Sequence, residues 1–159
     1  MARYTTFDDL RLIKRDLNES LIIAKAAKKD YKNIFLSHSS KDIEIVPAVI
    51  QILENHGGSV YIDKDDPSLA ETVTVKTAEI LRGIINRCKR MVLLVTSNTK
   101  DSLWIPWELG LGDGEINNQN VTIFPVTEKT YEGYLFEQEY LGLYRRIIWG
   151  KFKGKSENE

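Results

Sequence analysis

Short apolar segments alternate with longer segments of helical periodicity along most of this chain. Five segments have the length of strands and are rich in β-branched or aromatic residues. They are residues 33–37 (NIFLS), 59–63 (SVYID), 91–96 (MVLLVT), 121–126 (VTIFPV) and 145–149 (RRIIW). The third is a continuous apolar run, which is typical of a strand covered on both faces of a sheet.

The segments between these strands are predicted to be crossover helices. Strands joined in this way form parallel sheets with helices on both faces. We therefore predict an α/β fold of the flavodoxin-like type, with a five-stranded parallel sheet in the order 2-1-3-4-5. The first crossover helix is expected to start between Glu44 and Pro47 and to end near His56, and the next to span about residues 72–87. The following helix is expected to be short and to stop at Gly112 or Gly114.

The N-terminal segment has a helical pattern of its own. Apolar residues recur at helical spacing between residues 7 and 29, which predicts one amphipathic helix. Thr6 and Asp9 have the spacing of a capping box at its start. This helix is expected to pack on the main domain or on a partner.

The composition fits a globular protein with one main domain. The 159 residues are 42% hydrophobic and 28% charged, with a formal net charge of -1. We expect an N-terminal helical extension over residues 1–30, a domain over residues 31–150 and a polar tail over residues 151–159. Because the basic residues are dispersed along the chain, we expect neither nucleic acid nor an anionic membrane as a partner.

The sequence shows no pattern for an internal disulfide, a metal site, a signal peptide or a membrane span. The single cysteine, Cys88, cannot form an internal disulfide, and no pattern of Cys and His completes a metal site. No apolar run has the length of a signal peptide or of a membrane span. We therefore expect a cytoplasmic protein without a bound metal.

A glutamate and two tryptophans stand together at the predicted helix start after the third strand. The segment reads Trp104-Ile105-Pro106-Trp107-Glu108. In open α/β sheets, ligands bind beyond the carboxyl ends of the strands, where this helix begins. One carboxylate beside aromatic rings suits a flat, charged ligand. The alternative is that the rings belong to the core and the glutamate complements the helix dipole.

Two polar loops follow the first and second strands at the same end of the predicted sheet. The loop at residues 37–42 (SHSSKD) offers hydroxyls and backbone amides that suit phosphate or ribose oxygens, although these residues also suit helix capping. The loop at residues 63–71 is acidic, and its carboxylates suit ribose hydroxyls; its alternative role is a solvated connection. The glycines at residues 110–114 are not followed by the Lys-Ser or Lys-Thr of a nucleotide loop and indicate a helix stop.

The order of these pieces resembles that of the TIR (Toll/interleukin-1 receptor) domain family, particularly its bacterial members. The resemblance covers about residues 32–150. It rests on the SHSSKD loop, the VYID strand with its long loop, and the W-x-x-x-E motif formed by Trp104 and Glu108. It implies a flavodoxin-like fold and cleavage of NAD+ between nicotinamide and ribose. Pro106 and Trp107, inside the motif, depart from the family pattern.

The resemblance also implies functions for individual residues. Glu108 matches the catalytic glutamate of the family. Residues 63–71 match the loop that covers the substrate, and residues 35–38 match the floor of the pocket. The expected substrate-binding residues are Trp104, Phe35, Ser37, His38, Asp63 and Lys64. Since NAD+ is the substrate, no separate cofactor is expected.

The implied chemistry is compatible with a single carboxylate. Nicotinamide leaves ribose as a neutral ring, so its departure requires no general acid, unlike the hydrolysis of an ordinary glycoside. A carboxylate can bind the ribose diol and stabilise the oxocarbenium-like charge, while an aromatic ring holds the pyridinium. Attack by water gives ADP-ribose, and attack by an atom of the same molecule gives a cyclic ADP-ribose isomer. The family further implies self-association through TIR-TIR contacts and, in bacterial immunity, a product that acts on a separate effector.

Two other functions stay open. Some TIR domains are non-catalytic modules that only recruit other TIR domains. Absence of NAD+ turnover in both the wild type and Glu108→Ala would identify such a module, whereas turnover lost only in the variant would indicate catalysis. Nucleoside deoxyribosyltransferase-like enzymes share the sheet architecture and use a glutamate as nucleophile. A covalent adduct of Glu108 with a deoxynucleoside would identify that second alternative.

Overall fold

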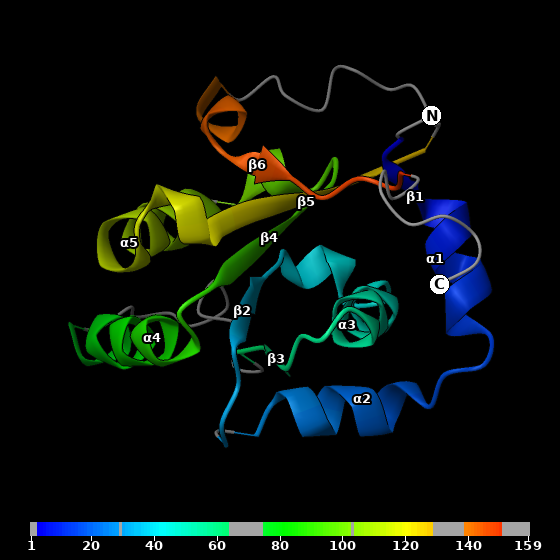
Figure 1. The fold of residues 1–159 in the computed structure, drawn as a ribbon, viewed down its shortest axis with the longest axis horizontal. Helices are drawn as coiled ribbons and strands as arrows, with labels where there is room; N and C mark the ends of the chain where they lie inside the picture. Colours follow the sequence, from blue (N-terminus) through cyan, green and yellow to red (C-terminus); the bar gives the residue numbers. More distant parts are fainter. Residues whose placement is uncertain (1–2, 29, 64–74, 103, 129–138, 151–159) are drawn as a thin grey trace, which may run out of the picture.

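The computed structural model describes residues 3–28, 30–63, 75–102, 104–128 and 139–150. A parallel sheet runs through the middle of the molecule (Figure 1). The predicted strands are β2 (Ile34–Ser37), β3 (Val60–Tyr61), β4 (Met91–Val95), β5 (Val121–Thr127) and β6 (Arg145–Arg146). They lie side by side in the order β3-β2-β4-β5-β6, and every neighbouring pair is parallel. If these five strands are numbered 1 to 5 along the chain, starting at β2, their order is 2-1-3-4-5. The prediction of a flavodoxin-like fold is therefore confirmed.

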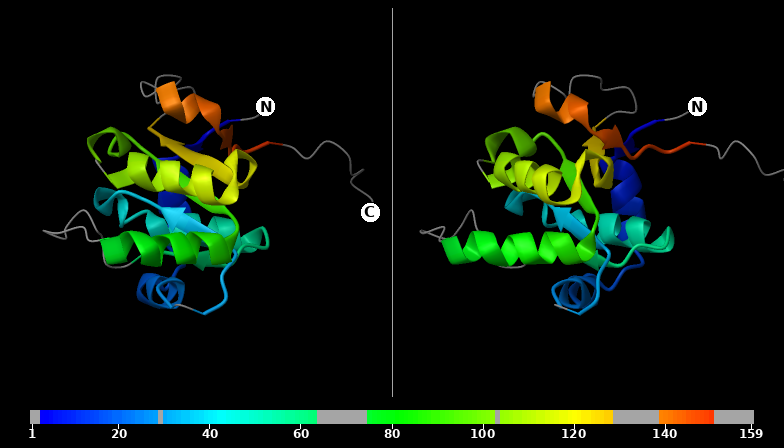
Figure 2. Two further views of the ribbon diagram at one scale, coloured as in Figure 1. Left: turned by 90° about the vertical axis from the view of Figure 1, so that its left-hand side faces the viewer. Right: turned by 60° about the vertical axis from the view of Figure 1, so that its left-hand side comes forward.

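Helices cover both faces of this sheet (Figure 2). α4 (Val75–Cys88) and α5 (Trp104–Ile116) lie on one face, and α3 (Val46–Asn55) lies on the other. Successive side chains of a strand point to opposite faces, so β2 contributes Phe35 to the apolar cluster under α4 and α5, and Leu36 to the cluster under α3. Both side chains are fully buried. The sheet therefore has a hydrophobic core on each side.

The first two crossover helices agree with the sequence pattern. Pro47 lies in the first turn of α3, where its missing N–H is not needed for helical hydrogen bonding. After α3, Gly57 has a φ of 89°, which glycine adopts without steric cost. α4 corresponds to the helix predicted at residues 72–87, although the residues before Val75 lie outside the described ranges. Short 3-10 helices complete the connections: η1 (Ser40–Asp42), η3 (Thr99–Asp101), η4 (Asn118–Asn120) and η6 (Glu139–Leu143).

α5 is longer than the sequence predicts. It passes through the glycines and ends at Ile116, so the prediction of a stop at Gly112 or Gly114 is wrong. A Cβ added at Gly112 would overlap the sulfur of Met91, which is fully buried at the start of β4. Gly112 therefore serves close packing between helix and strand. The helix ends before Asn117, whose φ of 72° is incompatible with a continuing helix.

The N-terminal segment begins with a strand that the sequence does not predict. β1 (Thr5–Thr6) pairs in parallel with β5, with Thr5 opposite Val126 and Thr6 opposite Thr127. β6 pairs with an earlier part of β5. A strand of two residues has no recognisable alternation, so it could not be inferred from the hydrophobic pattern.

Two helices follow where the pattern predicts one helix over residues 7–29. They are α1 (Phe7–Lys14) and α2 (Glu19–Ala26). The side chain of Asn18 accepts a hydrogen bond from the backbone N–H of Leu21 at 3.3 Å and so starts the second helix. The single-helix prediction is wrong because this cap interrupts a segment whose apolar spacing is otherwise continuous.

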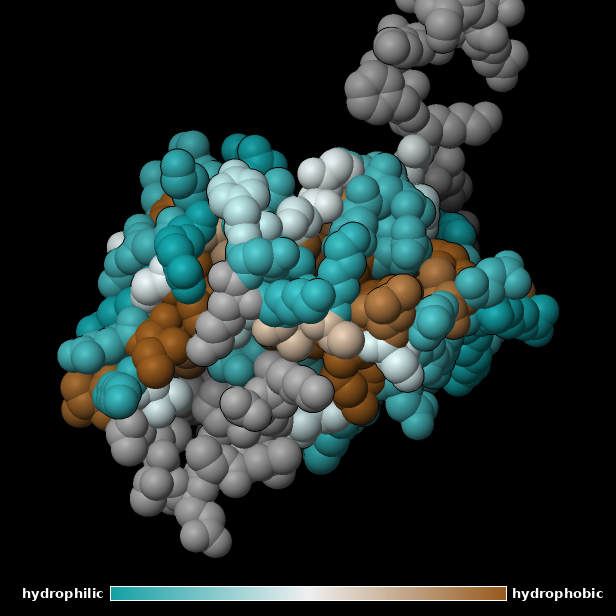
Figure 3. Space-filling model, turned by 90° about the horizontal axis from the view of Figure 1, so that it is seen from below, coloured by the Kyte–Doolittle hydropathy of each residue, from teal (hydrophilic) through white to brown (hydrophobic). Residues whose placement is uncertain are grey.

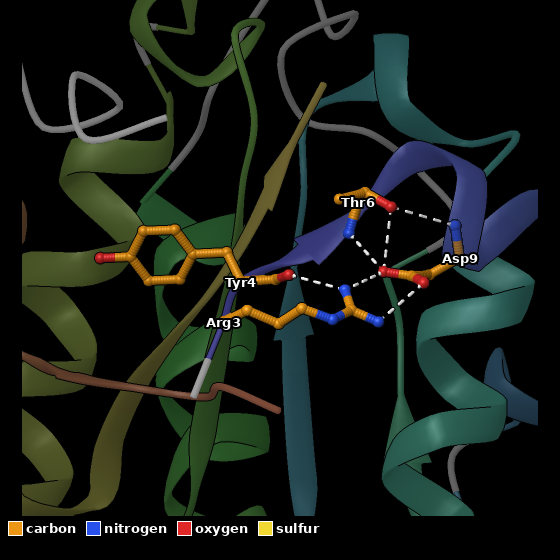
Figure 4. A network of polar contacts seen from close by, with 4 residues as sticks. All are labelled: Arg3, Tyr4, Thr6 and Asp9. Carbon is orange, nitrogen blue, oxygen red and sulfur yellow. Dashed lines mark hydrogen bonds and ion pairs between the residues drawn. The ribbon is translucent and has the colours of Figure 1, made fainter. Parts of the chain in front are cut away.

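The start of α1 is held by the predicted capping box (Figure 4). The N–H of Asp9 donates to the Thr6 hydroxyl at 3.2 Å, and the N–H of Thr6 donates to the Asp9 carboxylate at 2.8 Å. Arg3 donates two further bonds to this carboxylate, of 2.5 and 3.0 Å. The hydrogen bonding from Arg3 is the main reason that the pKa of Asp9 is lowered to about 2.

Exposed apolar side chains are spread over several elements. Seen from below, hydrophobic patches are separated by hydrophilic residues (Figure 3). Leu12, Leu21, Val75 and Leu143 are among the most exposed, and they belong to α1, α2, α4 and η6 respectively. Within the described ranges, no helix combines the length and the apolar character needed to cross a membrane.

Candidate active site

Glu108 and Ser37 meet at the carboxyl edge of the sheet, although 71 positions separate them in sequence. Ser37 is the last residue of β2, and Glu108 lies one turn after the start of α5. The Ser37 hydroxyl donates a hydrogen bond to Oε2 of Glu108. Ser37 is 2% exposed and Glu108 is 5% exposed. The structure therefore joins two of the residues that the sequence singles out.

The burial of Glu108 has an energetic consequence. Removing a carboxylate from water is costly, and a hydrogen bond to the charged group offsets part of that cost. Burial also limits screening by solvent, which strengthens the attraction between the carboxylate and a positive charge on a ligand. A carboxylate held in this way can stabilise positive charge that develops during a reaction.

An apolar cluster that includes two stacked aromatic rings lies between β2 and α5. Phe35 lies two residues before Ser37 and therefore on the same face of β2. Its ring stacks on that of Tyr61, with the ring centroids 6.0 Å apart and the planes inclined by 26°. Ile105 and Leu109 of α5 belong to the same cluster. This packing fixes the position of the helix that carries Glu108 relative to β2.

The start of α5 lies where the motif predicts it. Trp104 is the first residue of the helix, and Glu108 follows one turn later. The Ser102 hydroxyl accepts a hydrogen bond from the backbone N–H of Ile105 at 3.2 Å, which satisfies one of the free donors of the first turn. Pro106 lies within this first turn, where a missing N–H costs nothing. The departure from the family motif therefore leaves the helix start intact.

Some of the other predicted substrate-binding residues lie within the described ranges, and one does not. His38 follows Ser37 and is half-buried, and its Nδ1–H donates to the carbonyl of Ser39 at 3.0 Å. Asp63 is half-buried just beyond β3, which is the neighbour of β2 in the sheet. Lys64 lies outside the described residues. His38 and Asp63 are thus at the same edge as Glu108, and their contact with a substrate stays a prediction.

A second buried carboxylate at this edge is not part of the site that the sequence predicts. Asp42 is 3% exposed. Its two oxygens accept hydrogen bonds from the Thr96 hydroxyl at 2.7 Å and from the side-chain amide of Asn98 at 2.6 Å. These bonds tie the loop after β2 to the loop after β4. The partners stand 54 and 56 positions away, so the local pattern around Asp42 indicates only a helix cap.

No group of His, Cys, Asp and Glu side chains is arranged to hold a metal ion in the part of the chain that the structure describes. The groups at the carboxyl edge are instead carboxylates, hydroxyls, an imidazole and backbone amides. Such groups suit a ligand with hydroxyls and a positive charge. This matches the chemistry that the sequence pattern indicates.

Comparison with known proteins relates this chain to one family. The family model described as TIR domain matches residues 34–159, a range that begins with β2 and includes Glu108. A protein of Bacillus cereus named "Probable 3' cyclic ADP-D-ribose synthase ThsB'" is 37% identical over 144 residues, which cover 87% of this chain and 74% of that protein. A protein of Cytobacillus dafuensis named "Putative cyclic ADP-D-ribose synthase TIR2" is 32% identical over 85 residues, which cover 52% of this chain but 22% of that protein.

Proposed function

The chain belongs to the TIR domain family, and we propose that it cleaves NAD+ between nicotinamide and ribose and cyclises the remaining ADP-ribose. The observation that carries the proposal is the buried carboxylate of Glu108 at the carboxyl edge of the sheet, where it accepts a hydrogen bond from Ser37. The name of the relative that is 37% identical over most of the chain supports the product class.

In the proposed mechanism, Glu108 acts as the catalytic residue. As the bond between C1 of the ribose and the pyridinium nitrogen breaks, its electron pair leaves with nicotinamide, which becomes neutral. Positive charge then develops on the ribose carbon and ring oxygen. The carboxylate of Glu108 stabilises this charge, and burial of the site strengthens that interaction.

Trp104 is assigned to binding of the nicotinamide ring. It lies four positions before Glu108, a spacing that places two residues on the same helix face. An aromatic ring attracts a cationic pyridinium more strongly than the neutral nicotinamide that leaves. Ser37, His38, Asp63 and Lys64 are assigned to the ribose and phosphate oxygens, and Phe35 to the floor of the pocket.

The second step of the proposed reaction forms a bond within the same molecule. A ribose hydroxyl of the ADP-ribose portion attacks the ribose carbon that has lost nicotinamide, and its proton passes to a base or to water. The atoms of NAD+ are then divided between nicotinamide and a cyclic ADP-ribose isomer, with one proton released. Attack by water instead gives linear ADP-ribose, so exclusion of water favours the cyclic product.

The products of an incubation with NAD+ test this proposal. We expect nicotinamide and a cyclic ADP-ribose isomer in equal amounts, identified by chromatography and mass spectrometry. Linear ADP-ribose alone would contradict the cyclisation step, and unchanged NAD+ at high protein concentration would favour a non-catalytic TIR module. Release of a base from a deoxynucleoside, with NAD+ left intact, would favour a deoxyribosyltransferase-like activity.

We further propose that the chain self-associates through TIR-TIR contacts in the cytoplasm and that its product acts on a separate effector in bacterial immunity. Family membership supports this proposal. Specific activity is expected to fall on dilution, in step with the loss of oligomer. Constant specific activity across the transition to monomer would contradict self-association as a requirement, and NAD+ loss without a cyclic product in phage-infected cells would contradict the signalling function.

A further inference from the structure

A large cavity lies at the amino ends of the strands, on the opposite edge of the sheet from Glu108. Its volume is about 810 Å³, within the ~300–1,000 Å³ range of small-molecule sites. It is formed by the starts of β2, β4 and β5, by β6 and by the turn after α3. β4 separates the two edges, and its five residues span roughly 13 Å. The cavity is therefore distinct from the candidate active site.

Basic side chains line this cavity. Lys89, Arg90 and Arg145 contribute to its wall, and no aspartate or glutamate is among the described residues that line it. The ion pairs between described residues involve other cations, so these three side chains have no described carboxylate partner. The whole chain carries a formal net charge of -1, so this positive charge is a local feature. Unpaired cations around a concave surface attract anions.

Two further residues of the wall are compatible with an anion. The Nδ1–H of His56 donates to the carbonyl of Ile52 at 2.7 Å, and this side chain adds no negative charge to the cavity. Burial raises the pKa of the Cys88 thiol to about 11. Cys88 is therefore neutral at physiological pH and adds no negative charge to the cavity.

The turn between α4 and β4 forms part of the cavity wall. Lys89 has a φ of 64°, a conformation that is uncommon for residues other than glycine. Lys89 directly follows the last residue of α4, a position where a left-handed residue commonly ends a helix. The turn brings Lys89 and Arg90 to the cavity in succession, while Arg145 reaches it from β6.

We propose that this cavity binds a phosphorylated small molecule, whose phosphate groups are held by Lys89, Arg90 and Arg145. The forked guanidinium groups suit phosphate oxygens because they can donate two parallel hydrogen bonds. Tyr31 also lines the cavity and is 84% exposed, so its ring is accessible to the base of a nucleotide. The site is independent of the reaction proposed for Glu108.

Titration of the full chain with inorganic pyrophosphate and with ADP, followed by NMR, tests this proposal. We expect both probes to shift the backbone amides of Gly57, Lys89 and Asn120. The double variant Lys89→Gln/Arg145→Gln is expected to bind pyrophosphate at least tenfold more weakly, because it removes two positive charges that can bond to phosphate oxygens. Tighter binding of ADP than of pyrophosphate would show that the base contributes, and equal binding would show that the phosphates suffice.

Arg15→Gln is the control for loss of an exposed cation elsewhere, since Arg15 lies between α1 and α2, away from the cavity. Its affinity for pyrophosphate should stay within twofold of the wild type. The single variants Lys89→Gln and Arg145→Gln provide a second comparison if the double variant does not fold. The proposal is overturned if millimolar pyrophosphate shifts none of the three amides, or if the cavity variants bind it as well as the control does. NAD+ is absent from these titrations, so their outcome does not depend on turnover.

Discussion

At the residue scale, the two buried carboxylates at the carboxyl edge differ in their partners. Both oxygens of Asp42 accept hydrogen bonds from Thr96 and Asn98, so this carboxylate serves to hold two loops together. Glu108 accepts a hydrogen bond from Ser37, which is the last residue of β2. Since charged hydrogen bonds are directional, this contact orients the carboxylate that we propose to act on the ribose.

Substitution of Ser37 by alanine tests this orientation. Loss of a hydrogen bond to a charged group costs about 1.5–3 kcal/mol, so we expect kcat for NAD+ cleavage to fall roughly 10- to 100-fold. Steady-state kinetics with NAD+ measures the effect. Ser97→Ala is the control, because Ser97 is exposed at the same edge of the sheet. Equal kcat values in the two variants would show that the Ser37 hydroxyl has no part in the reaction.

At the scale of the element, α5 connects the candidate site to the core. Its first turns carry Trp104 and Glu108, and Gly112 lets its later part pack against Met91. The Tyr144 hydroxyl donates a hydrogen bond to the carboxylate of Asp113 at 3.0 Å. Burial is the main cause that raises the pKa of Tyr144 to about 12, and the bond to Asp113 raises it further. The helix is therefore fixed at both ends.

Two glycine substitutions in α5 are expected to have opposite effects on stability. Gly112→Ala forces a methyl group against Met91 and should lower the free energy of unfolding by about 1–3 kcal/mol. Gly114→Ala meets no atom within 4 Å and should raise it by up to about 1 kcal/mol, because alanine favours helices. Urea unfolding of both variants measures the difference. Similar midpoints would contradict the close approach of α5 to β4.

The start of α1 should contribute stability that depends on pH. The pKa of Asp9 is lowered from 3.8 to about 2, so its contribution is complete above about pH 5 and is lost as the pH falls through 4 towards 2. The side chains of Arg3 and Asp9 are 36% and 23% exposed, and screening by solvent limits the contribution of Asp9 to about 1–2 kcal/mol. Urea unfolding at pH 6 and at pH 2.5 should therefore show a smaller loss for Asp9→Asn than for the wild type. An equal loss in both proteins would contradict the assigned pKa.

At the scale of the whole molecule, the sheet separates two edges of different character. Glu108 and Asp42 lie at the carboxyl edge, and Lys89, Arg90 and Arg145 line the cavity at the amino edge. Helices cover both faces, so these edges are where the backbone of the strands is open to ligands. The proposed chemistry and the proposed phosphate site therefore do not compete for the same surface.

The sheet and the location of the candidate site could be predicted from the sequence because they depend on local patterns. Apolar runs such as residues 91–96 mark buried strands, and the helix start at Trp104 follows from its position after that run. The bond between Ser37 and Glu108 and the network of Asp42 could not be predicted, because their partners are distant in sequence. The continuation of α5 through Gly112 was missed for a related reason, since the pattern does not show which atoms lie opposite a glycine.

The comparison of Glu108→Gln with Glu115→Gln tests the central claim most directly. Both variants neutralise one carboxylate of α5, but Glu115 is exposed and bonded to Asn86. Nicotinamide release from NAD+ should fall at least about 100-fold in Glu108→Gln, because the carboxylate that stabilises the transition state is lost. It should be unchanged in Glu115→Gln. Undiminished release by a folded Glu108→Gln protein would contradict the assignment of Glu108 as the catalytic residue.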